Sequence, residues 1–308
     1  PEVELVAANG PAPLETHLHL LKYDSVHGRF PGELRIEGDS IVAGRHRLRI
    51  THEKDPRKID WKSAGVDMVM ECTGKFNNRG DAEAHLAGGA GRVIISAPAR
   101  DAEATIVYGV NNAMLKKAQR VISVGSCTTN CLAPLAQVLH QAVGIESGFM
   151  TTIHSYTGDQ NLVDGSHKDL RRARAAGLSM IPTSTGAAKT IGLVLPELAG
   201  KLDGIAIRVP TPNVSLVDLT FHATRDTDSA AINAALSKAA GGALRGVLGV
   251  SGEKLVSVDF AHNPLSGIVD LAATHVVGTR LVRVASWYDN EWGFSNRMWD
   301  VARLWGRS

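Results

Sequence analysis

The chain has 308 residues, of which 44% are hydrophobic and 21% charged, which is the composition of a globular protein of about two domains. A net charge of +2 gives no indication of nucleic-acid binding, although it would suit anionic substrates. Three cysteines are too few for a disulfide framework, and the sequence shows neither a membrane-spanning stretch nor a signal-peptide pattern. We therefore expect a cytoplasmic protein with no membrane or nucleic-acid partner.

Short apolar runs alternate with helical patterns over the first 126 residues. We expect strands at 3–8, 66–70, 92–96, 105–110 and 121–124, and helices at 14–22, 81–87 and 112–118. Apolar runs that are bounded by glycine and separated by helices predict a mostly parallel, doubly wound α/β sheet. Segments 33–36 and 47–51 alternate more and are expected as antiparallel additions.

Longer strand patterns follow from residue 145, at 148–153, 204–209, 214–222, 255–260, 268–271 and 280–287. Helices are fewer here, with one expected at 229–240, so this part reads as an α+β domain on a mixed or antiparallel sheet. The last helix, at 293–305, places Met298, Val301, Ala302 and Trp305 on one face. We expect one domain from 1–126 with the returning helix at 292–308, and a second from 127–291.

Cys127 is the first candidate nucleophile. It follows a buried strand that ends at Gly125 and Ser126, and it opens a helix, where the helix dipole and unpaired N–H groups favour a thiolate and could hold an anion. The alternative is a small buried cysteine beside a good N-cap. For Cys131, one turn further on, and for Cys72, the structural interpretation is favoured.

His154 is the candidate base for this thiol. It ends an apolar strand and leads into a loop, where a catalytic side chain can be aimed rigidly. With 12 histidines in the chain, a structural role is the alternative.

Three segments could bind anions. The basic run 168–174 is typical of a solvated helix face or of a set of intersubunit salt bridges. Thr183–Gly186 opens a helical pattern as a capping or anion-binding segment would, and Arg208 ends a strand where it could bind phosphate in a bidentate manner. Each of these signals is weak alone.

Together these segments resemble the phosphorylating glyceraldehyde-3-phosphate dehydrogenase family. The resemblance is carried by LLKYDSVHGRF (20–30), ECTGKF (71–76), SCTTNCLAP (126–134), HSYTGDQ (154–160), HKDLRRARAA (167–176), IPTSTGAAK (181–189), RVPTPNVS (208–215) and WYDNEWGFSNR (287–297). It implies a glycolytic-type oxidoreductase with a Rossmann-like, nucleotide-binding domain, in which Cys127 forms a hemithioacetal and then a thioester with glyceraldehyde 3-phosphate. His154 assists, hydride passes to NAD or NADP, and inorganic phosphate releases 1,3-bisphosphoglycerate.

The same resemblance implies roles for further residues. Thr157 and Arg208 would bind the substrate phosphate; Ser126, Thr128, Thr185 and Gly186 would bind inorganic phosphate; Asn9, Gly10, Thr73, Gly74, Ser96, Ser166, Asn290 and Phe294 would lie at the cofactor. The family is typically a homotetramer in which the 155–180 loop lies against a neighbouring subunit's cofactor. No metal site is expected.

Two departures concern the cofactor. The G-x-G-x-x-G loop that holds a pyrophosphate is absent from the sequence, so the dinucleotide domain is expected to lack its first βα unit, and a truncated record is the favoured explanation. Gly10 stands where an acidic residue usually binds the ribose 2′-hydroxyl, and Ser166 resembles enzymes that accept NADP. We therefore expect dual or NADP-leaning cofactor use.

Two other functions remain open. Erythrose-4-phosphate dehydrogenase shares the SCTTNC element, but its pattern generally lacks the Tyr-Thr pair found here as Tyr156 and Thr157. A truncated, non-catalytic scaffold has only the missing loop in its favour. A thiol protease or acyltransferase would leave the paired anion sites unexplained.

Overall fold

The computed structural model describes residues 3–307, which form two compact units. Within these residues, unit 1 comprises 3–104, 116–123 and 302–307, and unit 2 comprises 105–115 and 124–301. The last helix, α7 (Trp292–Gly306), begins in unit 2 and ends in unit 1.

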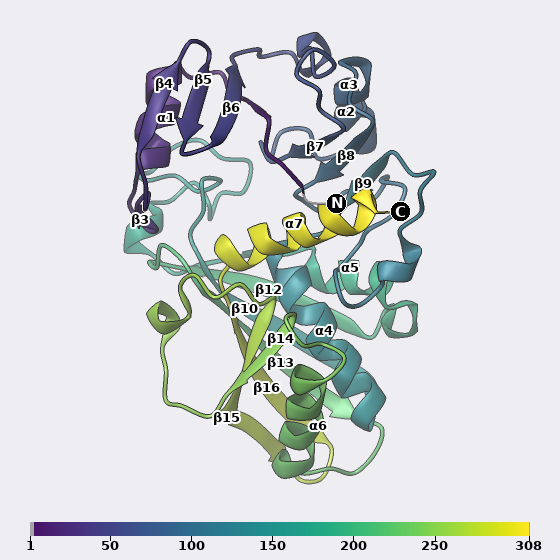
Figure 1. The fold of residues 1–308 in the computed structure, drawn as a ribbon. Coiled ribbons are helices and arrows are strands. Elements are labelled where there is room, and N and C mark those ends of the chain that lie inside the picture. Colours follow the sequence, from purple (N-terminus) through teal and green to yellow (C-terminus); the bar gives the residue numbers. More distant parts are fainter. Residues whose placement is uncertain (1–2, 308) are drawn as a thin grey trace. The chain divides into compact units, whose positions relative to one another are not determined.

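Unit 1 contains a four-stranded sheet and a separate three-stranded sheet (Figure 1). The first has the order β1 (Ala7–Asn9), β6 (His46–Thr51), β5 (Ser40–Ala43) and β4 (Leu34–Glu37), with β1 parallel to β6 and the other pairs antiparallel. The second is parallel throughout and consists of β7 (Met68–Glu71), β8 (Arg92–Ile95) and β9 (Val121–Ser123). The antiparallel additions expected near residues 33–36 and 47–51 are confirmed as β4 and β6.

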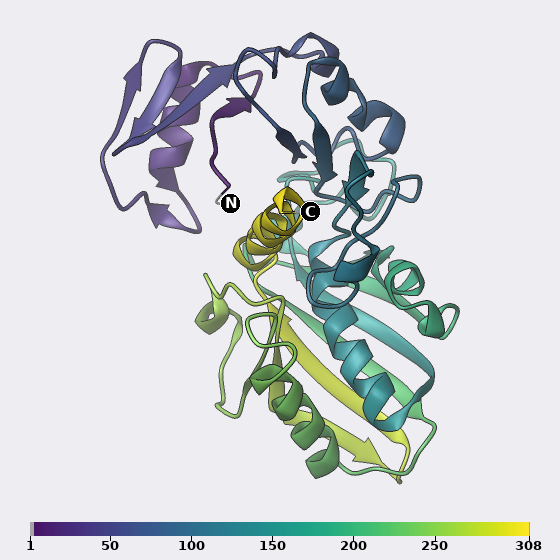
Figure 2. The same ribbon diagram turned by 45° about the vertical axis from the view of Figure 1, so that its right-hand side comes forward.

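Helices and short ribbons complete unit 1. Helix α1 (Leu14–Lys22) covers the four-stranded sheet, as Figure 2 shows, because Leu14 and Leu18 pack on a core of Leu34, Ile41 and Ile50. The remaining elements are β2 (Tyr23–Asp24), β3 (Gly28–Arg29), the 3-10 helix η1 (Pro56–Lys58), α2 (Arg79–Ala82) and α3 (Ala84–Ala87). A cavity of about 470 Å³ is lined by residues 3–9, which include β1 and the segment before it, and by residues 68–73, which include β7 and the two residues after it.

Unit 2 is built on a seven-stranded mixed sheet, as the sequence predicts. Its order is β11 (Ile181–Ser184), β12 (Leu202–Val209), β10 (Ile145–Ser155), β13 (Ser215–Ala223), β16 (Leu281–Tyr288), β15 (Gly267–Val277) and β14 (Leu248–Ser251). Helices α4 (Cys127–Val143), α5 (Ala187–Val194) and α6 (Ser229–Gly241) pack against it and bury one continuous apolar core (Figure 1). Short 3-10 helices are η2 (Asn112–Met114), η3 (Ala176–Leu178), η4 (Pro196–Leu198) and η5 (Ser257–Phe260).

Two expected strands are wrong, and side chains explain both. Residues 105–110 form no strand because Asn111 itself accepts from the Val107 N–H at 2.7 Å and donates to the Thr105 carbonyl at 2.8 Å, which replaces a neighbouring strand. At 255–260 the Asp259 carboxylate accepts from the Val256 N–H at 2.8 Å and caps the 3-10 helix η5.

Three other elements are shorter than expected. The strand predicted at 3–8 is reduced to β1, the helix predicted at 81–87 is divided into α2 and α3 around Glu83, and the helix predicted at 112–118 is the single turn η2. In α7, by contrast, the predicted apolar face of Met298, Val301, Ala302 and Trp305 is buried.

Candidate active site

Cys127 is the first residue of α4, as predicted. The preceding Ser126 is the N-cap, and its Oγ accepts a hydrogen bond from the Thr129 N–H at 3.1 Å. Gly125 makes the turn into the helix with φ of 67°, and a Cβ there would lie 3.2 Å from Thr129 Cγ2. The thiol therefore lies at a helix N-terminus, where unpaired N–H groups can stabilise a negative charge.

His154 lies opposite the thiol. The distance from Cys127 Sγ to His154 Nε2 is 3.5 Å, and His154 Nδ1 lies 2.7 Å from the Ser155 carbonyl oxygen. With the proton on Nδ1, which the accepting Ser155 oxygen requires, Nε2 presents its lone pair to the thiol; Arg208 Nη1, which can only donate and lies 3.0 Å from Nδ1, then bonds the Ser155 oxygen and not the imidazole. The arrangement is that of a nucleophile beside its base.

Burial sets the charge state of this pair. It lowers the pKa of His154 to about 3, with help from the nearby Arg208 cation, so the imidazole is neutral at physiological pH. Burial also raises the pKa of Cys127, while Arg208 and the hydrogen bonds from Thr128 oppose the rise. The resting pair is a thiol that donates to a neutral imidazole, and Arg208 and the helix N-terminus stabilise the thiolate once the proton moves.

Arg208 reaches this pair through the register of the sheet. The parallel pairing of β10 with β12 places His154 opposite Arg208. Arg208 Nη1 lies 3.0 Å from His154 Nδ1, donates to the Ser155 carbonyl at 2.9 Å and lies 3.5 Å from Thr157 Oγ1. Its Nε is buried and has no hydrogen-bond partner in the described part of the chain. A half-buried cation whose buried Nε is an unused donor is suited to an anionic ligand.

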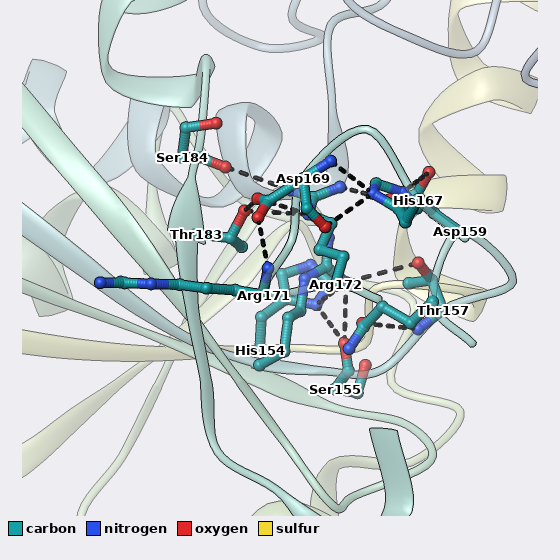
Figure 3. A network of polar contacts seen from close by, with 12 residues as sticks. His154, Ser155, Thr157, Asp159, His167, Asp169, Arg171, Arg172, Thr183 and Ser184 are labelled. Atoms are coloured by element: carbon teal, nitrogen blue, oxygen red, sulfur yellow. Dashed lines mark hydrogen bonds and ion pairs between the residues drawn. The ribbon is translucent and has the colours of Figure 1, made fainter. Parts of the chain in front are cut away.

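Arg172 connects the loop after His154 to strand β11 through an ion pair and hydrogen bonds, as Figure 3 shows. Arg172 pairs with Asp159 and donates to Thr183 Oγ1 at 2.9 Å and to the Ser184 carbonyl at 3.3 Å. Asp169 accepts from Thr183 Oγ1 at 2.6 Å. The basic run 168–174 is thus not a helix face: it forms turns, and Arg172 is largely buried in the network.

The four residues predicted to bind inorganic phosphate belong to two helix starts. Ser126 and Thr128 flank Cys127 on α4, whereas Thr185 and Gly186 precede α5, where Thr185 Oγ1 accepts from the Ala187 N–H at 3.2 Å. Helix α5 packs against α4 in the core of unit 2.

Tyr288 is a site residue that sequence reasoning missed. Its buried hydroxyl lies 2.8 Å from both Thr128 Oγ1 and Thr152 Oγ1, and its ring contacts His154 edge-on with centroids 5.9 Å apart. Its only sequence signal was the matching segment at 287–297.

Asn290 is held in one orientation. Its Oδ1 accepts from the hydroxyls of Ser155 and Ser215, each at 2.9 Å, so its amide N–H groups face away from the serines. Phe294 follows on α7 and is half-buried, and Ser166 is exposed on the loop.

The other predicted cofactor residues, Asn9, Gly10, Thr73, Gly74 and Ser96, belong to unit 1. The Asn9 side-chain amide already has hydrogen-bond partners at the end of β6. It accepts from Thr51 Oγ1 and the Glu53 N–H and donates to the Glu53 carbonyl, each at 2.9 Å. The Ser96 N–H donates to the Glu71 carbonyl at 3.0 Å. A Cβ at Gly10 would lie 2.5 Å from His17 Cε1.

Comparison with known proteins connects both units to one family. Residues 1–79 match the glyceraldehyde 3-phosphate dehydrogenase NAD-binding domain, and residues 126–290 match its C-terminal domain. Glyceraldehyde-3-phosphate dehydrogenases of Xanthobacter flavus and Cereibacter sphaeroides are each 58% identical over 99% of this chain and 91% of their own length, and that of Geobacillus stearothermophilus is 52% identical over 98% and 90%.

The fold and the matched domains define an NAD(P)-dependent oxidoreductase with a nucleotide-binding and a catalytic domain. More specifically, the chain belongs to the glyceraldehyde 3-phosphate dehydrogenase family. Across residues 3–307 we find no helix that is long and apolar enough to cross a membrane.

Proposed function

We propose that this chain oxidises glyceraldehyde 3-phosphate and phosphorylates the product to 1,3-bisphosphoglycerate. The observation that carries the proposal is the Cys127–His154 pair beside Arg208, a half-buried cation whose buried Nε is an unused donor. Unit 2 is proposed to carry this chemistry and unit 1 to bind most of the dinucleotide, in line with the domains that they match.

The residues account for each proton in the proposed reaction. Cys127 Sγ attacks the aldehyde carbon while its proton passes to His154 Nε2, which returns the proton to the new alkoxide and completes the hemithioacetal. His154 then takes the hydroxyl proton as the carbon is oxidised to a thioester. A bound nicotinamide would supply the hydride acceptor. Attack of inorganic phosphate on the thioester carbon would release the acyl phosphate and leave Cys127 as a thiolate, which takes the proton from His154 and so restores the resting thiol and neutral imidazole.

Thr157 and Arg208 are proposed to bind the phosphate of the substrate, supported by their contact and by the unpartnered Arg208 Nε. Ser126, Thr128, Thr185 and Gly186 are proposed to bind the attacking phosphate, since both helix starts offer N–H groups and hydroxyls. Asn290, fixed by two serines, fits a carboxamide because its N–H groups remain available to a carbonyl acceptor.

We further propose that NADP is accepted as well as NAD. Position 10 carries no carboxylate to repel a 2′-phosphate, and the close approach of His17 leaves no room for a longer side chain unless His17 moves. Ser166 is exposed and could reach a ligand. A kcat/KM for NAD that exceeds that for NADP a hundredfold would contradict this part.

A cytoplasmic homotetramer is the proposed assembly. Exposed apolar side chains on the loop, namely Leu162, Val163, Leu170, Leu178 and Met180, support an interface with a second copy. Analytical ultracentrifugation should show a tetramer, and a monomer at micromolar concentration would contradict the proposal.

The activity is tested by turnover with and without inorganic phosphate, which the phosphorylating reaction requires. Equal turnover without phosphate would contradict the proposal, and faster turnover of erythrose 4-phosphate would favour that alternative substrate. Iodoacetate should label Cys127 in one-to-one stoichiometry near neutral pH. Labelling no faster than that of an ordinary exposed thiol would favour a non-catalytic scaffold.

A further inference from the structure

Three buried polar side chains of unit 1 are joined by hydrogen bonds. Trp61 Nε1 donates to His85 Nδ1 at 3.1 Å, and His85 Nε2 lies 2.8 Å from Glu71 Oε2. All three side chains are almost fully buried and line the cavity beside β1 and β7. None of them takes part in the proposed chemistry of unit 2.

The direction of both hydrogen bonds that join these three side chains is fixed. An indole N–H can only donate, so His85 Nδ1 must accept, and the proton of a neutral imidazole must lie on Nε2. His85 Nε2 therefore donates, and its partner must be an acceptor. The Glu71 carboxylate satisfies this requirement, whereas an amide with its N–H₂ turned toward His85 would not.

The other oxygen of Glu71 holds the segment after β7. Glu71 Oε1 accepts from the Thr73 N–H at 2.7 Å and from the Thr73 hydroxyl. The same hydroxyl accepts from the Lys75 N–H at 3.1 Å, and Asn77 Nδ2 donates to the Gly74 carbonyl at 2.7 Å. Thr73 and Gly74 are exposed, so this turn faces solvent, while the buried Glu71 carboxylate holds it from the protein interior.

We propose that Trp61, His85 and Glu71 form a hydrogen-bonded relay that positions the Thr73–Gly74 turn for the dinucleotide. The relay rests on the proposed cofactor role of Thr73 and Gly74, and its own members are positioning residues. Burial alone would raise the pKa of Glu71, but the hydrogen bonds from His85 and Thr73 outweigh it, so the pKa is lowered and the acceptor stays ionised at neutral pH.

The test exploits the fixed direction of the bonds. In Glu71→Gln the amide oxygen can still accept from Thr73 only if its N–H₂ opposes His85 Nε2–H, so one end of the relay must break. In a Trp61→Phe background the indole donor is gone, His85 can move its proton to Nδ1, and Nε2 can accept from the new amide. The effect of E71Q on the hydrogen exchange of the Thr73 amide should therefore be smaller in W61F than in the wild type. Glu37→Gln, which removes an exposed ion-paired carboxylate of the same unit, is the control.

Two measurements need no cofactor. Hydrogen exchange of the Thr73 amide should be about tenfold faster in E71Q, since the new side-chain amide cannot bond both His85 and Thr73. It should be less than about threefold faster when E71Q is added to W61F, where that amide can bond both. ¹⁵N NMR of wild-type His85 at pH 7 should show the neutral tautomer with the proton on Nε2. Either a proton on Nδ1 or equal effects of E71Q in both backgrounds would overturn the relay.

The dinucleotide dissociation constant completes the test. E71Q should raise it about tenfold without changing kcat at saturating cofactor, and E37Q should change neither. An unchanged dissociation constant in E71Q would overturn the positioning role. If the wild type binds no dinucleotide, the proposed cofactor function fails, while Thr73 exchange and the His85 tautomer still decide whether the relay exists.

Discussion

Replacing His154 by asparagine should change how the stability of the protein depends on pH. The folded protein holds the His154 pKa at about 3, against 6.5 for an unperturbed histidine. Below pH 6.5 His154 therefore binds a proton in the unfolded chain but not in the folded protein. Its contribution to the free energy of unfolding is largest above pH 6.5 and is lost as the pH drops toward 3. At about 1.36 kcal/mol per pH unit, His154 alone makes the free energy of unfolding about 2 kcal/mol lower at pH 5 than at pH 8.

Urea unfolding of wild type and His154→Asn, followed by tryptophan fluorescence at pH 8 and pH 5, measures this difference. The variant should lose about 2 kcal/mol less than the wild type between the two pH values. His46→Asn removes an exposed histidine and should leave the wild-type pH dependence in place. Parallel pH profiles for the wild type and His154→Asn would refute the neutral, buried base.

Four further outcomes are expected. Cys127→Ser should abolish turnover and the fast iodoacetate labelling, leaving only slow labelling of the exposed Cys72, whose pKa is raised by burial of its thiol. Cys131→Ser should change neither, because burial raises the pKa of Cys131 to about 12. Arg208→Lys should raise the KM for glyceraldehyde 3-phosphate about tenfold, because lysine lacks the planar fork, while the KM for NAD should not change. Tyr288→Phe should lower the free energy of unfolding by about 1–3 kcal/mol, because a buried threonine hydroxyl loses its partner; Tyr23→Phe, at an exposed position, is the control in thermal melts. Gly10→Asp combined with His17→Ala should lower kcat/KM for NADP relative to NAD by at least about tenfold, and an unchanged ratio would contradict the cofactor argument.

The sequence predicts well where a regular pattern and a local signal agree. Helix α4 follows from the Ser126 cap and the apolar pattern behind it, and the mixed sheet of unit 2 follows from its long strands. Prediction fails where a side chain replaces a backbone partner, as Asn111 does for Thr105 and Val107, since an apolar run gives no sign of that substitution.

The candidate site shows the same division. Cys127 and His154 stand at recognisable boundaries of a helix and a strand, so each could be selected from the sequence. The contact between Arg208 and His154 depends on the register of β10 against β12, and the contacts of the Tyr288 hydroxyl depend on two strands and one helix meeting at one point. Neither is encoded in local spacing.

One consequence of the Arg208 contacts concerns how the enzyme distinguishes substrates. The guanidinium that is proposed to hold the distal phosphate also donates to the Ser155 carbonyl, which fixes the orientation of His154. A phosphate on Arg208 would therefore influence the geometry of proton transfer as well as the occupancy of the site. Glyceraldehyde without its phosphate should accordingly suffer in kcat and not only in KM, and added inorganic phosphite should recover part of the lost turnover.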